Sequence, residues 1–292
     1  KMLTSSTTEQ EGSKSTEADL DGFVRDGFRL DAASGTDCIN NSGDNFVAWC
    51  WKAGGNKNTF NVDDVGYATF AASGTTAGTI TPTGTSIGTK QGFSIIKYAG
   101  TDTGSSQTIP HGLNEPPVFW MFKNLSQSGD WIVYTTAIDG SSDYLKLNAT
   151  DAANSGVSPW STAPTNSVIT VGTNNVDTCN NGDNYVMYAW HDVPGLQKFG
   201  KYSGNSSSSG SFIECGFRPS IVLLKKIDNT DTNSGWHWYD NKRNIYNPAN
   251  NFLLASHAYY ENRAANNTAD VTTYTVDFLS NGFRLTHDSN NL

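Results

Sequence analysis

Aromatic side chains are the residue class with the most chemical promise in this sequence. The chain has eight tryptophans and twelve tyrosines in 292 residues, and an exposed aromatic ring with polar neighbours offers a sugar both an apolar face and hydrogen-bonding groups. Tryptophans that recur at equivalent positions are better explained as core residues. Aromatic residues in loops outside the repeats are stronger candidates, and they give a predicted glycan-binding set of Trp160, Tyr259, Tyr260 and Arg263.

The sequence carries few of the patterns that indicate catalysis or metal binding. It contains no H-E-x-x-H or G-x-x-x-x-G-K-[ST] motif. Only six glutamates occur, and eight of the twenty-two aspartates stand beside glycine or asparagine, where turn formation explains them. The five histidines are scattered singly, without the close spacing of metal ligands. We therefore expect a protein that is not an enzyme, with no catalytic residues, no metal and no cofactor.

The charge balance limits the classes of partner. A net charge of −9 argues against nucleic acid, because phosphate binding depends on clustered lysine and arginine. No apolar run approaches the ~18 residues of a membrane span, so we expect no membrane contact. The four cysteines show no C-x-x-C spacing, and we expect free thiols rather than a disulfide framework.

Internal repeats are the most informative feature of the sequence. In the longest match, a polar turn leads into an aromatic-rich stretch. The matched pairs are 41–51 with 180–190, 97–100 with 201–204, 26–30 with 281–285, and Trp131 with Trp236. Three copies of one unit of about 100 residues account for these matches.

The repeats predict how the chain is divided. Residues 1–55 are expected to be the C-terminal half of a first β repeat, 92–193 a complete repeat, and 199–292 a repeat that lacks its last strand. Residues 56–91 are either a Gly/Thr-rich linker or a hairpin insertion, and 194–198 form a short linker. We expect the chain to be a segment of a longer polypeptide, with strand exchange from a neighbouring chain as the alternative.

Composition and strand signals predict the fold class. Charged residues make up only 16% of the chain, while asparagine, serine, threonine and glycine, which are poor in helix interiors, are abundant. Short runs rich in valine, isoleucine and aromatic residues alternate with Gly, Asn, Asp and Pro clusters. This pattern is typical of an antiparallel β-sandwich. We predict an all-β fold of tandem antiparallel β-sandwich-like repeats, with helical turns conceivable only at 151–155 and 250–262.

The repeat consensus resembles a known group of proteins. The segments that carry the resemblance are 46–55, 92–98, 111–113, 163–165, 200–205 and 279–285. They are similar to virion structural proteins of marine bacteriophages, in particular tail-fibre proteins of cyanobacterial phages. Those proteins carry repeats of a β-rich domain, often downstream of a concanavalin-like lectin domain.

The resemblance implies a function. It implies a non-enzymatic, tail-fibre-like segment on the exterior of the virion, built as a homotrimer, in contact with other virion proteins and attached to a host-surface glycan. Two alternatives remain open. One is a purely architectural head-fibre or tail/baseplate component, and the other is a tailspike-like polysaccharide depolymerase. The family has no assigned catalytic residues, so none can be transferred to this sequence.

Overall fold

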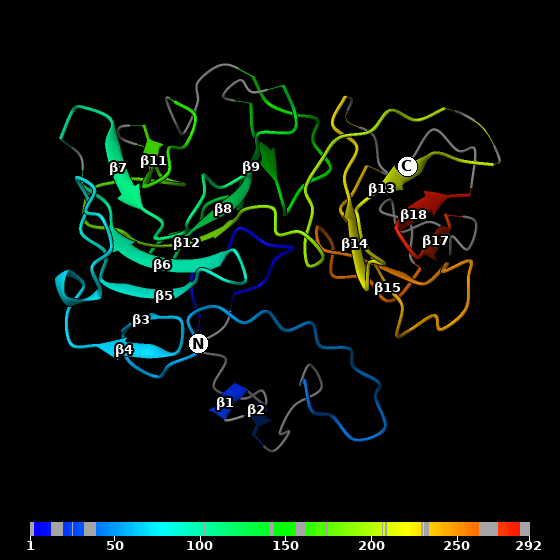
Figure 1. Cartoon of the computed structure of the whole chain (residues 1–292), viewed down its shortest axis with the longest axis horizontal. Helices are drawn as coiled ribbons and strands as arrows, with labels where there is room; N and C mark the ends of the chain where they lie inside the picture. Colours follow the sequence, from blue (N-terminus) through cyan, green and yellow to red (C-terminus); the bar gives the residue numbers. More distant parts are fainter. Residues whose placement is uncertain are drawn as a thin grey trace.

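The regular secondary structure of the described residues is almost entirely β-strand, which confirms the all-β prediction (Figure 1). The computed structural model describes residues 3–12, 20–24, 26–31, 39–101, 103–139, 143–155, 162–172, 175–205, 207, 209–228, 230, 234–262 and 274–286. Within these ranges it has eighteen strands and one short 3-10 helix, Ala71–Ser73. No helix among the described residues has the length and apolar character needed to cross a membrane.

The largest sheet has eight strands and defines what we call the central unit. Its strands are β3 (Phe60–Val62), β4 (Val65–Tyr67), β5 (Gly84–Gly88), β6 (Phe93–Ala99), β8 (Phe119–Asn124), β9 (Ile132–Thr135), β10 (Leu145–Lys146) and β12 (Asn184–Trp190). They lie in the order β10-β9-β8-β12-β6-β5-β3-β4. Residues 56–91 therefore add a hairpin and one further strand to this sheet. All pairings are antiparallel except that of β3 with β5.

A second, two-stranded sheet covers one face of the first. It consists of β7 (Gln107–Pro110) and β11 (Val168–Val171), paired antiparallel. Side chains alternate across β12, so that Tyr185, Met187 and Ala189 point into the core between the sheets. The ring of Tyr98 stacks on Tyr185 at 5.2 Å. The central unit is thus a β-sandwich with β12 in the middle of its main sheet.

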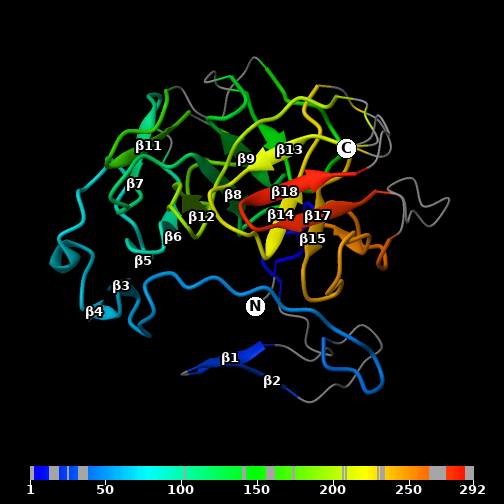
Figure 2. The ribbon, with the colours of Figure 1, turned by 45° about the vertical axis from the view of Figure 1, so that its right-hand side comes forward.

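The third unit repeats this plan with fewer strands. It contains β13 (Phe212–Glu214), β14 (Ile221–Leu224), β15 (His237–Asp240), β16 (Phe252–Leu254), β17 (Val276–Leu279) and β18 (Gly282–Leu285). They form two sheets, β14-β15-β16 and β13-β18-β17, that enclose a core around Tyr239, Phe252 and Phe278 (Figure 2). Residues 201–204, which match the end of β6, form no strand.

The central and third units are joined through the outer faces of their main sheets. Trp131 and Trp236, which occupy equivalent places in the repeat, lie in one buried cluster. The indole nitrogen of Trp236 donates to the Lys146 carbonyl at 2.8 Å, and Phe119 stacks on Phe199 at 5.1 Å. The contact therefore has a packed apolar centre as well as the covalent link.

The repeated tryptophans test the core prediction. Trp131, Trp190 and Trp236 are buried, as expected from their recurrence. The expectation was wrong for Trp51, which is 45% exposed. Trp190 packs on Phe93 at 4.6 Å inside a paired sheet, whereas Trp51 lies in a segment without a strand partner.

A separate hairpin precedes the central unit. It consists of β1 (Leu20–Val24) and β2 (Gly27–Leu30), paired antiparallel. An ion pair between Arg29 and Asp21 crosses it. Its match in the third unit, β17–β18, carries an equivalent cross-strand ion pair and buries its phenylalanines in the core. In β1–β2, by contrast, Phe23 is 85% exposed.

Candidate functional site

The structure separates the predicted glycan-binding residues. Trp160 and Arg263 lie outside the described residues. Tyr259 is half-buried against the core of the third unit, and its ring stacks on His257 at 5.0 Å. Tyr260 is 62% exposed. Of the adjacent pair, only Tyr260 presents most of its surface to solvent.

Tyr260 belongs to a loop that is tied to its neighbour. We call residues 241–251 and 255–262, the loops on either side of β16, the tyrosine loops. Arg243 Nη1 lies 3.0 Å from Glu261 Oε1. Asn262, whose positive φ of +63° suits asparagine, donates its amide to Asn251 Oδ1 at 3.2 Å. These bonds fix the two loops relative to each other.

The other tyrosine loop presents a second exposed aromatic ring. Tyr246 is 79% exposed and its neighbour Ile245 is 68% exposed. Asn247 bonds this loop to β17. Its side-chain amide donates to the Phe278 carbonyl at 3.1 Å and accepts from the Phe278 N–H at 2.9 Å. Asn244 Oδ1 accepts from the Asn251 N–H at 2.7 Å. Tyr246 is thus an exposed ring on a loop whose backbone is fixed.

Arg243 connects the tyrosine loops to the sheet. Its Nε lies 2.7 Å from Asp240 Oδ2, and its Nη2 donates to the Trp238 carbonyl at 2.9 Å. Burial opposes ionisation of Asp240, but bonds from Arg243 and from the backbone N–H groups of Lys242 and Arg243 outweigh it and hold the pKa of that carboxyl below its ordinary value. Asp240 is therefore a charged anchor.

A tryptophan cluster lies beside this anchor. It consists of Trp49, Trp51 and Trp238. The ring of Trp49 is 4.9 Å from Trp238, and that of Trp51 is 5.7 Å from Trp238. Trp49 Nε1 donates to Asp240 Oδ2 at 3.3 Å, and the guanidinium of Arg243 lies over Trp49 at 5.6 Å. The cluster borders a hollow of about 220 Å³.

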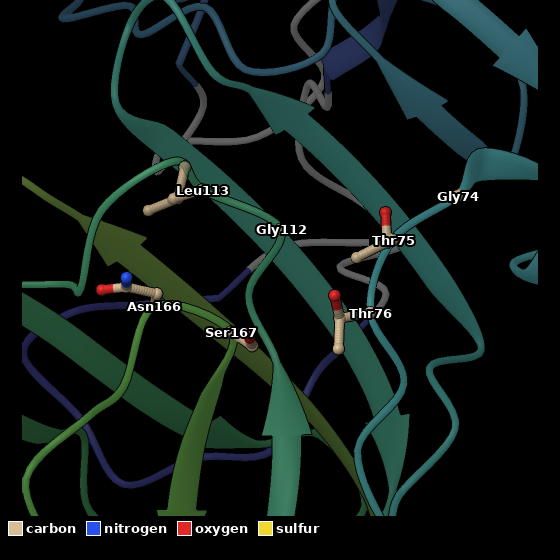
Figure 3. A pocket seen from close by; sticks show the side chains of 7 residues that line it. All are labelled: Gly74, Thr75, Thr76, Gly112, Leu113, Asn166 and Ser167. Atoms are coloured by element: carbon tan, nitrogen blue, oxygen red, sulfur yellow. The ribbon is translucent and has the colours of Figure 1, made fainter.

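A polar hollow of about 160 Å³ lies on the central unit (Figure 3). It is lined by Gly74, Thr75, Thr76, Gly112, Leu113, Asn166 and Ser167. Figure 3 shows Gly74, Thr75 and Thr76 on one segment, Gly112 and Leu113 on a second, and Asn166 and Ser167 on a third. Both hollows are smaller than the roughly 300–1,000 Å³ of typical ligand pockets.

His111, the residue before Gly112 of the polar hollow, has a structural role. Its Nδ1 accepts the Leu113 N–H at 3.1 Å, so Nε2 carries the proton and donates to the Thr165 carbonyl at 3.1 Å. Burial lowers the pKa of His111 to about 4. A neutral imidazole thus joins two loops of the central unit.

Charged side chains in and beside the eight-stranded sheet of the central unit form a network of bonds. The buried Lys123 donates its ammonium to the carbonyls of Thr8 and Gly129 at 3.0 and 2.9 Å. Lys146 pairs with Asp130 at 2.7 Å, and Asp177 Oδ1 accepts the Asp130 N–H at 2.7 Å. Burial raises the pKa of Asp177. Both carboxylates thus bond to neighbouring loops, and Lys123 holds the N-terminal segment through the Thr8 carbonyl.

Comparison with known proteins gives one match. The model of a family described as a domain of unknown function (DUF7483) matches residues 1–292. The chain belongs to the DUF7483 family. No curated protein and no solved structure matches it. Because the match spans β1–β2, the central unit and the third unit, the DUF7483 domain comprises the whole array and not one repeat.

Two residues of this DUF7483 chain were missed by the sequence reasoning. Tyr246 and Ile245 stand between asparagines, and an aromatic residue within an amide-rich run is the signal that could have indicated them. Their exposure depends on the bonds from Asn247 to Phe278, which join residues 31 positions apart. That long-range contact has no counterpart in the local pattern.

Proposed function

We propose that this DUF7483 chain is a non-enzymatic segment of a bacteriophage virion fibre that contacts a host-surface glycan through the tyrosine loops. The observation that carries the proposal is the pair of exposed rings, Tyr246 and Tyr260, on loops fixed by the Arg243–Glu261 ion pair. The sequence resemblance to marine phage virion proteins supports the viral assignment. The chain acts on the particle exterior as a homotrimer among other virion proteins.

The chemistry of the tyrosine loops suits a carbohydrate. A phenol ring offers an apolar face and a hydroxyl that both donates and accepts. Asn244, Asn250 and Asn251 supply amides in the same loops. Because the loops are already ordered by side-chain bonds, less conformational entropy is lost on binding.

The arrangement of the units supports a fibre. The apolar contact around Trp131 and Trp236 joins the central and third units directly. Small β-sandwiches connected in this way form a rigid body whose outer loops are displayed to the surroundings. Such a body suits a projecting part of a particle.

A glycan-array measurement with the full chain tests the proposal. Glycans and surface polysaccharide of candidate bacterial hosts are probed with the wild-type chain and with the Tyr246→Ala/Tyr260→Ala variant. We expect binding by the wild type and a loss of at least about tenfold in affinity in the variant, since each ring removed costs about 1 kcal/mol or more. Phe23→Ala, which removes a similarly exposed ring from β1, is the matched control and is expected to bind normally.

Three results would contradict parts of the proposal. Equal binding by the Tyr246→Ala/Tyr260→Ala variant and the Phe23→Ala control would show that the tyrosine loops do not bind the glycan. Absence of binding by a folded wild-type chain would favour the architectural role. Release of reducing sugar from host polysaccharide would show a depolymerase. Light scattering of the purified chain tests the trimer.

One observation favours the architectural alternative specifically. Phe23 and Phe28 of the β1–β2 hairpin are 85% and 38% exposed, although their counterparts in the third unit are buried. An apolar hairpin of this kind fits a contact with another virion protein. Pull-down of virion proteins by the wild-type chain, and its loss in a Phe23→Ser/Phe28→Ser variant, would support this role.

A further inference from the structure

The third unit has an open position in its main sheet. In the central unit β12 lies between β8 and β6 and pairs with both. In the third unit, β14 takes the place of β8 and residues 201–204 match the end of β6. Among the described residues β14 pairs only with β15, so its other edge is free. Such an edge is a template for one more strand.

Residues 45–51 have the sequence of that missing strand. They align with β12 from Asn45 on Asn184 to Trp51 on Trp190. Unlike β12, they form no strand. Phe46 is 56% exposed, whereas Tyr185 at the matching position of β12 is fully buried.

The turn before residues 45–51 already has the conformation of the turn before β12. Asn41 Nδ2 donates to Asp44 Oδ2 at 2.9 Å, and Asn180 Nδ2 donates to Asp183 Oδ2 at the same distance. Each turn contains a glycine with positive φ, +91° for Gly43 and +82° for its counterpart. The segment is therefore preceded by the local structure that leads into β12.

The segment also lies against the β14–β15 pair. Residues 39–52 pass beneath the third unit in both views (Figures 1 and 2). Trp49 and Trp51 contact Trp238 on β15. The hollow of about 220 Å³ is lined by residues 47–50 on one side and by Ser220 and Ile221 at the start of β14 on the other. The side-chain contacts are present and the backbone pairing is not.

The two units pack on each other through equivalent residues. Met121 and Leu223, like Trp131 and Trp236, share one cluster between the main sheets. The third unit is thus within reach of the segment that precedes the central unit, and Trp49 and Trp51 of that segment contact Trp238.

One pair of sequence differences fits this placement. In the central unit the hydroxyl of Tyr185 is 3.2 Å from Asn124 Nδ2. The segment has Phe46 in place of Tyr185. The pairing of β14 with β15 aligns Leu224 with Phe122, which puts Lys226 in the place of Asn124. The third unit, with Phe46 and Lys226 at these places, therefore lacks both the tyrosine hydroxyl and the asparagine amide that lies beside it in the central unit.

We propose that residues 45–51 form the β12-equivalent strand of the third unit in the same chain. The strand runs antiparallel to β14 in the register of β12 on β8. Trp51 then lies opposite Ile221, Cys50 opposite Val222, and Trp49 opposite Leu223. Trp49 stays on the face that carries Trp238. The N-terminal segment thereby covers the free edge of β14.

Disulfide trapping with the native Cys50 tests this register. Val222→Cys places a second thiol opposite Cys50, on the core side of the sheet. Leu223→Cys is the matched control, because the next residue along a strand points to the other face. After mild oxidation of the full chain, peptide mass spectrometry is expected to find a Cys50–Val222→Cys disulfide within single chains, and no disulfide between Cys50 and the control position.

The same experiment can overturn the proposal. Linkage of Cys50 to position 222 between two chains would assign the strand to a second copy. Linkage to position 223 in place of 222, or no linkage in a folded variant, would also reject it.

Hydrogen exchange of the wild-type chain gives a second readout that needs no core substitution. We expect protection of the amides in 45–51 and on β14. Val47→Pro, which cannot continue a paired strand, is expected to remove the protection of 45–51 and of the β14 amides that do not bond to β15. Rapid exchange of 45–51 in the wild type would contradict the proposal.

Discussion

The guanidinium of Arg243 holds the carboxylate of Asp240 in a buried ion pair, with Nε 2.7 Å from Oδ2. Asp240 is almost wholly inaccessible, so removal of its partner leaves a buried charge uncompensated. We expect Arg243→Met to lower the free energy of unfolding by about 3–5 kcal/mol, measured by urea denaturation. Lys198→Met, which breaks the more exposed pair with Asp192, is the control and is expected to cost less than about 1 kcal/mol. Similar losses in both variants would contradict the anchoring role.

His111 makes stability depend on pH. Its pKa is about 4 in the folded chain and ~6.5 when unfolded. Between these values the unfolded chain binds a proton that the folded chain excludes, so the free energy of unfolding falls as the pH drops from 6.5 to 4. The loss is expected to reach about 3 kcal/mol.

The control for this pH effect is His111→Gln, whose amide can accept and donate but does not titrate. Urea unfolding at several pH values should give a shallower dependence for this variant in the same window. Identical slopes for the two proteins would remove His111 as the cause.

Lys123 fastens the N-terminal segment to the central unit. Its ammonium bonds two carbonyls, one of them from Thr8. The Thr8 carbonyl also accepts the Gly129 N–H at 2.9 Å, so we expect Lys123→Met to leave the Gly129 carbonyl without its lysine donor, at about 1–3 kcal/mol, and to speed hydrogen exchange in residues 3–12. Lys97→Met, at an exposed position of β6, is the matched control. Unchanged exchange in the Lys123 variant would show that other contacts hold the segment.

Two glycines separate the effect of crowding from that of backbone conformation. Gly112 and Gly195 both have positive φ, +68° and +79°. A Cβ at Gly112 would lie 2.4 Å from Ile87 Cδ1, while one at Gly195 would meet nothing within 4 Å. Gly195→Ala is expected to cost about 1 kcal/mol from backbone strain alone. Thermal unfolding should show a clearly larger loss of stability for Gly112→Ala than for Gly195→Ala. Equal losses in the two variants would mean that the Ile87 side chain moves aside without cost.

Local patterns predicted the strands well and their partners less well. The apolar runs around Trp120 and Tyr239 are strands because period-two alternation is a local property. The sequence left open whether residues 56–91 are a linker or a hairpin insertion. They add β3, β4 and β5 to the eight-stranded sheet, and a local pattern does not show which sheet edge is available for pairing. The burial of Trp51 was predicted wrongly for the same reason, because an aromatic segment is buried only where it pairs into a sheet that packs on a core.

The candidate site was predicted only in part. Tyr260 is exposed as a binding residue must be, whereas Tyr259 is held against the core by its packing on His257. Neighbouring residues in a loop can point in opposite directions, and the sequence does not distinguish them. Tyr246 was missed because its loop is shaped by Asn247 and Phe278 across the fold.

The buried contact between the two units determines how the molecule would respond to mechanical load. Bending at the short connection between the units would have to pull the Trp236 indole off the Lys146 carbonyl and expose the apolar cluster around it. Under flow or tension, force would therefore pass through this cluster and not through the connecting backbone. The two sandwiches would turn together as a stiff lever, keeping the tyrosine loops at a constant angle to whatever the chain is attached to.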